Sequence, residues 1–216
     1  MISSLFEIYD PYSVFCNLGF NWFPSFLIVF LGVFDFWCLN SSIVYFYVVL
    51  LCFMVNEFIN FYSYTKMKVS VFLFISLFLF VLFINILGLI PYVFSCSSHF
   101  VFSVSFGFPF WVAFIFMGWF NFNSKFFSHL VPLGTPLALI SFMVLIETIS
   151  SLIRPWSLSI RLMSNMISGH LLMVLLGNCG FYVFLVQLVL FLFEFFVCFI
   201  QAFVFSVLLT LYSSEI

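Results

Sequence analysis

Long apolar runs separated by short polar stretches dominate the chain. Residues 69–91 and 99–120 each fit one membrane-spanning helix, because a crossing takes about 20 apolar residues. Residues 136–178 and 181–214 are too long for a perpendicular crossing, so we expect two long, tilted helices that form a hairpin. The runs lack the two-residue alternation of barrel strands. The pattern predicts an all-α integral membrane protein of about five or six helices, forming a single membrane domain over residues 1–216.

The apolar stretch 25–55 is harder to divide, because Asp35 and the polar run 40–42 interrupt it. It exceeds the length of one crossing and falls short of two crossings with a loop. We expect a first span at 25–39, followed by an interfacial helix at 43–60.

Loop charges predict the orientation of the helices. Lys66 and Lys68 precede the 69–91 span and Lys125 follows the 99–120 span, so a hairpin places all three lysines on one side. The positive-inside rule assigns that side to the matrix or cytoplasm. The N-terminal segment has two acids and no basic residue, so we expect it on the opposite side. This assignment requires an odd number of crossings before residue 61, which is why we place one span there.

Composition supports the membrane assignment. The chain is 66% hydrophobic and 6% charged, with a mean hydropathy of +1.35. Soluble domains carry about 25% charged residues. The formal net charge of −2 gives no basic surface for nucleic acid. The six cysteines form no CxxC pair, so we expect buried free thiols and no disulfide framework.

Arg161 lies deep within an apolar run, and an arginine stays charged at every accessible pH. Lipid exposure of that charge is costly, so such a residue normally faces protein or a water-filled path. In one interpretation, 136–153 and 162–178 are separate spans and the intervening loop holds Arg154 and Arg161. That loop would lie on the outer side, against the charge rule. The alternative is one long helix that carries both arginines within the membrane, and we favour it.

Helical spacing then gathers the polar residues into a sparse track. Glu147, Arg154 and Arg161 recur every seven residues and share one face of a helix, drifting only about 20° per step. His170 lies nine residues beyond Arg161, about 180° around an ideal helix. In the following run, Glu194 and Gln201 again lie seven residues apart. Two antiparallel helices thus carry acids, fixed cations, an imidazole and an amide through the bilayer.

These residues stand in a recognisable motif. RLxxNxxxGH begins at Arg161, and IQAxVF follows at residues 200–205. Together with NILGLIPY at residues 85–92, they make residues 82–215 resemble subunit a of the F-type ATP synthases in its mitochondrial form. The first 80 residues carry almost none of this signature.

The resemblance implies the stator half of a proton-driven rotary motor. Two offset aqueous half-channels would deliver protons to and from carboxylates on a c-ring of small hydrophobic hairpin subunits. Arg161 matches the arginine that attracts an ionised ring carboxylate and prevents a proton short circuit. His170 and Glu194 match the inlet pair on the side away from the matrix. Glu147 and Glu215 match acids lining the matrix half-channel.

Further expectations follow from the same resemblance. Asn165 and Gln201 would support the arginine. The partners would be the c-ring, other stator subunits, lipid and protons, with no nucleic acid. The location would be the mitochondrial inner membrane, with the N-terminus in the intermembrane space and the C-terminus in the matrix. The absence of an Arg-rich transit peptide and the 39 phenylalanines favour an organelle-encoded chain.

Other classes explain the residues less well. A haem-bearing subunit needs paired histidines on facing helices, which His99, His129 and His170 do not supply. A secondary transporter usually shows an internal repeat, and the two long runs differ in length and motif. A passive structural subunit leaves the polar track unexplained. The sequence has no nucleotide-binding loop and no catalytic nucleophile, so we expect ATP chemistry on other subunits, and no cofactor or metal on this one.

Overall fold

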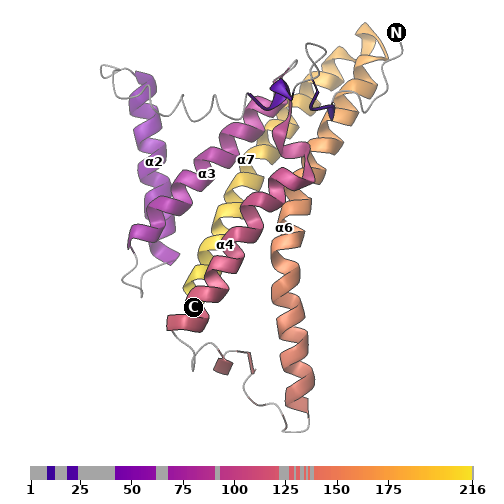
Figure 1. Cartoon of the computed structure of the whole chain (residues 1–216). Helices are drawn as coiled ribbons and strands as arrows, with labels where there is room; N and C mark the ends of the chain where they lie inside the picture. Colours follow the sequence, from indigo (N-terminus) through magenta and orange to yellow (C-terminus); the bar gives the residue numbers. More distant parts are fainter. Residues whose placement is uncertain are drawn as a thin grey trace.

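A computed structural model describes residues 9–12, 19–23, 42–61, 68–90, 93–121, 127–128, 130–131, 134, 136 and 139–215. Every regular element in these ranges is helical (Figure 1). The long helices are α2 (Ser42–Phe61), α3 (Lys68–Leu89), α4 (Phe100–Asn121), α6 (Ile140–Gly177) and α7 (Phe184–Glu215). Short 3-10 turns are η2 (Phe20–Trp22), η4 (Cys96–Ser98) and η6 (Phe181–Val183). The prediction of an all-α fold is confirmed.

Four of these helices, α3, α4, α6 and α7, are long and apolar enough to cross a membrane. The bounds of α3 and α4 are close to the predicted ranges 69–91 and 99–120. The first predicted span, 25–39, lies outside the described residues.

One unbroken helix, α6, runs through the region for which the sequence allowed two interpretations. The interpretation that placed Arg154 and Arg161 in a loop is therefore wrong. Pro155 lies inside this helix, where it removes one backbone hydrogen bond. Figure 1 shows α6 bending near its middle. A proline is an ordinary cause of such a bend.

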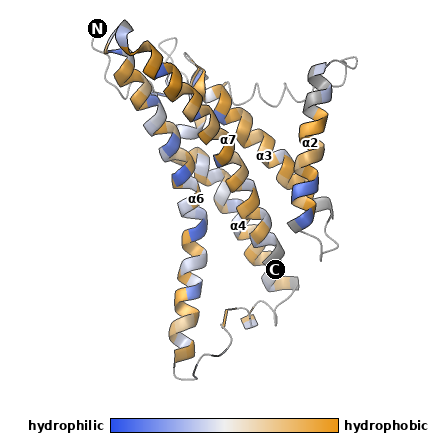
Figure 2. Ribbon diagram, turned by 180° about the vertical axis from the view of Figure 1, so that it is seen from behind, coloured by the Kyte–Doolittle hydropathy of each residue, from blue (hydrophilic) through white to orange (hydrophobic). Residues whose placement is uncertain are grey.

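The second half of α6 packs on the bundle, whereas the first half separates from it in both ribbon views (Figures 1 and 2). Close packing begins near the proline. A Cβ at Gly107 of α4 would lie 3.2 Å from Ser159 Oγ and 3.6 Å from the carbonyl oxygen of Pro155. The Ser159 hydroxyl itself donates to that carbonyl at 2.7 Å. The missing side chain at Gly107 therefore lets α4 approach the bend in α6.

The core lies around α3, which packs most extensively against α7. Its largest fully buried side chains come from α2, α3, α6 and α7: Phe58, Phe74, Phe78, Leu158, Phe205 and Leu209. Exposed apolar side chains cover the outer faces of the helices, as the orange ribbons in Figure 2 show. This distribution suits a protein whose surrounding solvent is lipid.

α2 buries Met54 and Phe58 and exposes Tyr45, Val48 and Phe53 on its outer side. A helix lying on a membrane surface normally has a polar face toward water. α2 is apolar on both sides over most of its length and carries polar side chains, Asn56, Glu57 and Asn60, only near its C-terminal end. Its interfacial placement stays a prediction of the sequence.

The described cysteines are all free thiols. Cys96 and Cys198 are buried, as expected. The expectation of burial is wrong for Cys52 on α2 and for Cys179 in the turn after α6, which are both exposed. A thiol behaves as a small apolar group, so lipid-facing positions accept it.

Candidate functional site

A tight turn brings the end of α6 back against the start of α7. The chain reverses through residues 178–180, and Gly180 adopts a φ of +91°, in the left-handed region that glycine enters without a steric penalty. The amides of Asn178 and Cys179 donate to carbonyls of the last α6 turn. The two helices are therefore antiparallel, and residues before the turn face residues after it.

The closest approach in this hairpin is between Gly169 and Glu194. A Cβ at residue 169 would lie 2.8 Å from Glu194 Cδ and 3.0 Å from each carboxyl oxygen. Glycine thus leaves space for a carboxyl group between the helices. Glu194 is only 9% exposed, and its Oε1 has no hydrogen-bond partner among the described residues.

A small cavity beside this carboxyl collects several polar side chains. Its volume is about 20 Å³, enough for about one water molecule. The lining residues come from the ends of α3, α6 and α7: Leu89, Asn165, Met166, His170, Glu194, Val197 and Cys198. The buried Nε2 of His170 has no partner among the described residues. A water in the cavity would have an imidazole, a carboxyl group and an amide around it.

An amide pair extends the site along the α6–α7 hairpin, away from the connecting turn. Asn165 Nδ2 donates to Gln201 Oε1 at 3.1 Å, and this bond joins α6 to α7. Gln201 is buried, and its own Nε2 has no partner among the described residues. The predicted residues Asn165, His170, Glu194 and Gln201 therefore lie in one connected region.

Arg161 lies one helical turn from Asn165, on the exposed side of α6. No ion pair joins its guanidinium to an acid within the described part of the chain. The neighbouring exposed side chains on α6 include Trp156 and Ile160. A fixed cation thus projects from an exposed face that carries apolar side chains and the serines Ser157 and Ser164, next to the polar region inside.

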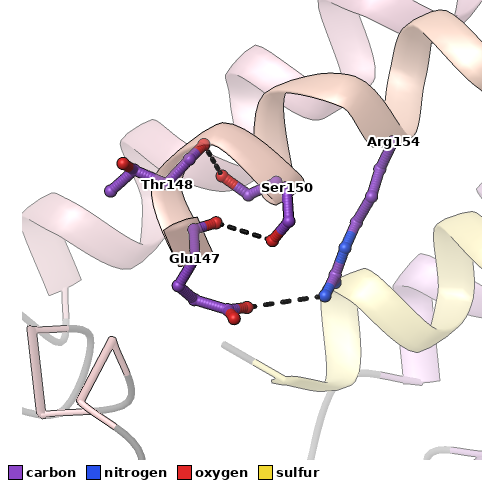
Figure 3. A network of polar contacts seen from close by, with 5 residues as sticks. Glu147, Thr148, Ser150 and Arg154 are labelled. Atoms are coloured by element: carbon purple, nitrogen blue, oxygen red, sulfur yellow. Dashed lines mark hydrogen bonds and ion pairs between the residues drawn. The ribbon is translucent and has the colours of Figure 1, made fainter. Parts of the chain in front are cut away.

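Glu147 lies apart from this region, on the half of α6 that separates from the bundle. Arg154 Nη2 lies 3.6 Å from Glu147 Oε1, and their side chains are 35% and 46% exposed (Figure 3). The Arg154 guanidinium also lies 5.2 Å from the centre of the Tyr212 ring. Glu215, the last residue of α7, follows three residues after that tyrosine. The two acids predicted for a second channel therefore belong to the other end of the hairpin.

Sequence reasoning missed one residue at the site, Tyr9. Its hydroxyl donates to the Ile167 carbonyl at 3.2 Å, and its ring meets the His170 ring edge-on at 6.4 Å between centroids. The N-terminal region carries no motif that points to this position. Only the three-dimensional packing of the chain brings it to α6.

His99 lies beside Tyr9, under an aromatic cover of Trp22 and Phe94, whose rings are each 5.2 Å from the imidazole. Burial lowers the pKa of His99, and the neighbouring Tyr9 backbone opposes that shift. His99 is therefore neutral at physiological pH.

The cavity arrangement suits proton exchange. An imidazole and a carboxyl group can each accept and release a proton near neutral pH when their surroundings adjust them. Because the imidazole and the carboxyl group both line a water-sized space, a proton can pass between them through one bound water. No strong permanent partner fixes the protonation of Glu194 within the described residues.

Comparison with known proteins identifies the family. Residues 18–214 match the family described as ATP synthase A chain. The chain belongs to this family. It is 42% identical to ATP synthase subunit a of Locusta migratoria over 224 residues, which cover all of both chains. It is 41% identical to ATP synthase subunit a of Drosophila melanogaster over 224 residues, again covering both chains fully. Identity to the protein of that name from Apis mellifera ligustica is 41%, over 100% of this chain and 97% of the relative.

The resemblance inferred from the motif is thus confirmed over nearly the full chain, including most of the N-terminal part that carried little signature. Membership of the ATP synthase A chain family means that this chain works with other ATP synthase subunits.

Proposed function

We propose that this chain translocates protons as the stator subunit beside a c-ring. Protons would enter through one half-channel, neutralise a ring carboxylate, and leave through a second half-channel after the ring has turned. An ionised carboxylate is costly in hydrocarbon and its protonated form much less so. Proton delivery therefore decides which ring positions can face lipid, and rotation follows.

One observation carries the proposal. In a member of this family, the two residues predicted for the inlet, His170 and Glu194, line one water-sized cavity together with Asn165, which was predicted to support the arginine. We assign His170 and Glu194 to proton transfer in the inlet half-channel. Asn165 and its partner Gln201 continue the polar path toward Arg161.

Arg161 would hold the ionised ring carboxylate and separate the two half-channels. Its exposed position and lack of a described acidic partner leave the guanidinium available to a partner subunit. Around it, exposed apolar side chains such as Ile160 and the small serines Ser157 and Ser164 leave room for a helix of a partner subunit to pack closely. Lysine would serve poorly, because a buried lysine can lose its proton whereas arginine cannot.

Glu147 and Glu215 would line the outlet half-channel on the matrix side. Glu147 is partly exposed and paired with Arg154, so it would give the path a polar, hydrated wall. We place the chain in the mitochondrial inner membrane as a single, organelle-encoded membrane domain. Its N-terminus would face the intermembrane space and its C-terminus the matrix.

The test is ATP-driven proton pumping by the assembled complex carrying Arg161→Ala. We expect pumping to fall by at least about a hundredfold, because one charge-stabilising group can contribute that much to a reaction. ATP hydrolysis and the amount of assembled complex serve as readouts of integrity. Ser164→Ala is the matched control, since Ser164 is exposed one turn away and bonds only its own helix.

Normal pumping in the Arg161→Ala complex would refute the proposed mechanism. Loss of pumping in Ser164→Ala as well would attribute the effect to disruption of the helix surface. The proposal requires that the Arg161→Ala complex assembles and hydrolyses ATP but does not pump protons. The Ser164→Ala complex must pump normally.

A further inference from the structure

The segment Tyr9–Tyr12 lies against α6 at the level of the cavity, and Tyr9 makes the contacts. Its hydroxyl donates to the backbone carbonyl of Ile167 at 3.2 Å. Its ring meets the imidazole of His170 in an edge-on arrangement at 6.4 Å between centroids. Aromatic pairs favour this geometry and this range of distances. The Tyr9 ring therefore covers the His170 imidazole on the side of α6 where the segment Tyr9–Tyr12 packs.

The electrostatics of Tyr9 agree with this placement. Burial raises the pKa of its phenol, and the charge of Glu194 raises it further. The hydroxyl consequently stays protonated and remains a hydrogen-bond donor at any physiological pH. Glu194 must also lie close enough to act on it. Tyr9 thus contacts one titratable group of the cavity, His170, and is influenced by the charge of the other, Glu194.

Two further contacts hold this segment in place. The imidazole of His99 lies beside the Tyr9 backbone, under the rings of Trp22 and Phe94. Asn21 Nδ2, from η2, donates to the Asp10 carbonyl at 3.1 Å. The N-terminal segment is therefore anchored to α6 by Tyr9, to η2 by Asp10, and to the start of α4 through His99.

We propose that Tyr9 is a lid residue that restricts water access to His170 and Glu194 from the N-terminal side. The cavity beneath holds about one water molecule. With the tyrosine ring removed, bulk water would reach the imidazole and the carboxyl group directly. The restriction is inferred from the contacts of Tyr9 with His170 and Ile167. Its consequence for proton delivery rests on the proposed function.

Cys198 supplies a native reporter of access, because it is buried and lines the same cavity. The experiment adds a small cationic methanethiosulfonate to the intact complex in lipid nanodiscs, which leave both sides accessible. Peptide mass spectrometry then gives a modification rate for each cysteine. Cys96 is the internal control, since it is also buried but lies outside the cavity.

We expect Tyr9→Ala to accelerate modification of Cys198 by at least about tenfold, because thiol reactivity follows exposure. Tyr9→Phe should stay within about twofold of the wild type, since the ring still covers the imidazole. Tyr12→Ala is the matched control on the same segment, because Tyr12 is 67% exposed. It should leave the Cys198 rate unchanged. The Cys198 modification rate is measured in parallel in Tyr9→Val. This variant replaces Tyr9→Ala as the test if the alanine variant does not assemble.

Unchanged Cys198 modification in Tyr9→Ala, or in Tyr9→Val where that variant decides, would overturn the lid. Equal acceleration at Cys96, or in Tyr12→Ala, would also overturn it, because the effect would then be general loosening. The proposed function fails in a different measurement. A Glu194→Gln complex that pumps normally would remove the proton role of the cavity and leave the access result intact.

Discussion

Two acids on the α6–α7 hairpin, Glu147 and Glu194, have opposite surroundings. Glu147 is partly exposed and lies 3.6 Å from the guanidinium of Arg154, on the half of α6 that leaves the bundle. Glu194 is buried between the helices, and its Oε1 has no partner among the described residues. The glutamate at one end of the hairpin therefore has a permanent counter-charge, whereas the glutamate at the other end has none among the described residues.

The difference indicates which acid can change its charge during turnover. Glu147 has a fixed guanidinium 3.6 Å from its carboxyl group. A buried carboxyl group without a fixed partner can exist in either state, depending on the proton supply from a neighbouring imidazole or water. We therefore expect Glu194 to exchange protons, whereas Glu147 stays paired with Arg154 in a partly exposed wall.

The largest effect should come from filling the space that Glu194 occupies. In Gly169→Ala the new Cβ would lie 2.8 Å from Glu194 Cδ, so the carboxyl group must move. We expect proton pumping to fall by at least about tenfold, because proton transfer needs donor and acceptor within hydrogen-bond reach. Thermal unfolding should show a loss of about 1–3 kcal/mol from overpacking.

Gly177→Ala is the matched control at the end of the same helix. Its Cβ would meet only Gln187 Nε2, at 3.9 Å, which is an ordinary contact. We expect unchanged pumping and stability equal to or slightly above the wild type, since alanine favours a helix more than glycine does. Wild-type pumping in Gly169→Ala would mean that the position of the Glu194 carboxyl is unimportant.

A smaller effect should come from the ion pair at the other end. A double-mutant cycle of Glu147→Gln and Arg154→Gln, read by thermal unfolding of the complex, should give a coupling energy below about 1 kcal/mol. Partly exposed pairs rarely contribute more than this. A coupling above about 3 kcal/mol is typical of breaking a buried pair. That result would place Glu147 in surroundings like those of Glu194 and remove the contrast.

Much of this architecture follows from the pattern of the sequence. Uninterrupted apolar runs specify helices because a chain in lipid must satisfy its backbone hydrogen bonds internally. The charge rule favoured one helix through Arg154 and Arg161, and α6 runs unbroken through both. Helical spacing likewise placed Glu147 and Arg154 on one face, where they form an ion pair.

Contacts between distant segments could not be predicted in this way. The position of Tyr9 over His170 joins residues 158 positions or more apart and depends on how the N-terminal segment crosses the bundle. The cavity is the space left by side chains of three helices, which no periodicity encodes. The close approach of Gly169 to the Glu194 carboxyl depends on the register of the α6–α7 hairpin.

The most direct test of the contrast compares Glu194→Gln with Glu147→Gln in ATP-driven proton pumping by the intact complex. Each change removes a titratable proton and keeps the shape of the side chain. We predict at least about a tenfold loss for Glu194→Gln and less than about a threefold loss for Glu147→Gln, because only the former removes a group that exchanges protons. Wild-type pumping in Glu194→Gln, or equal losses in the two variants, would contradict the account.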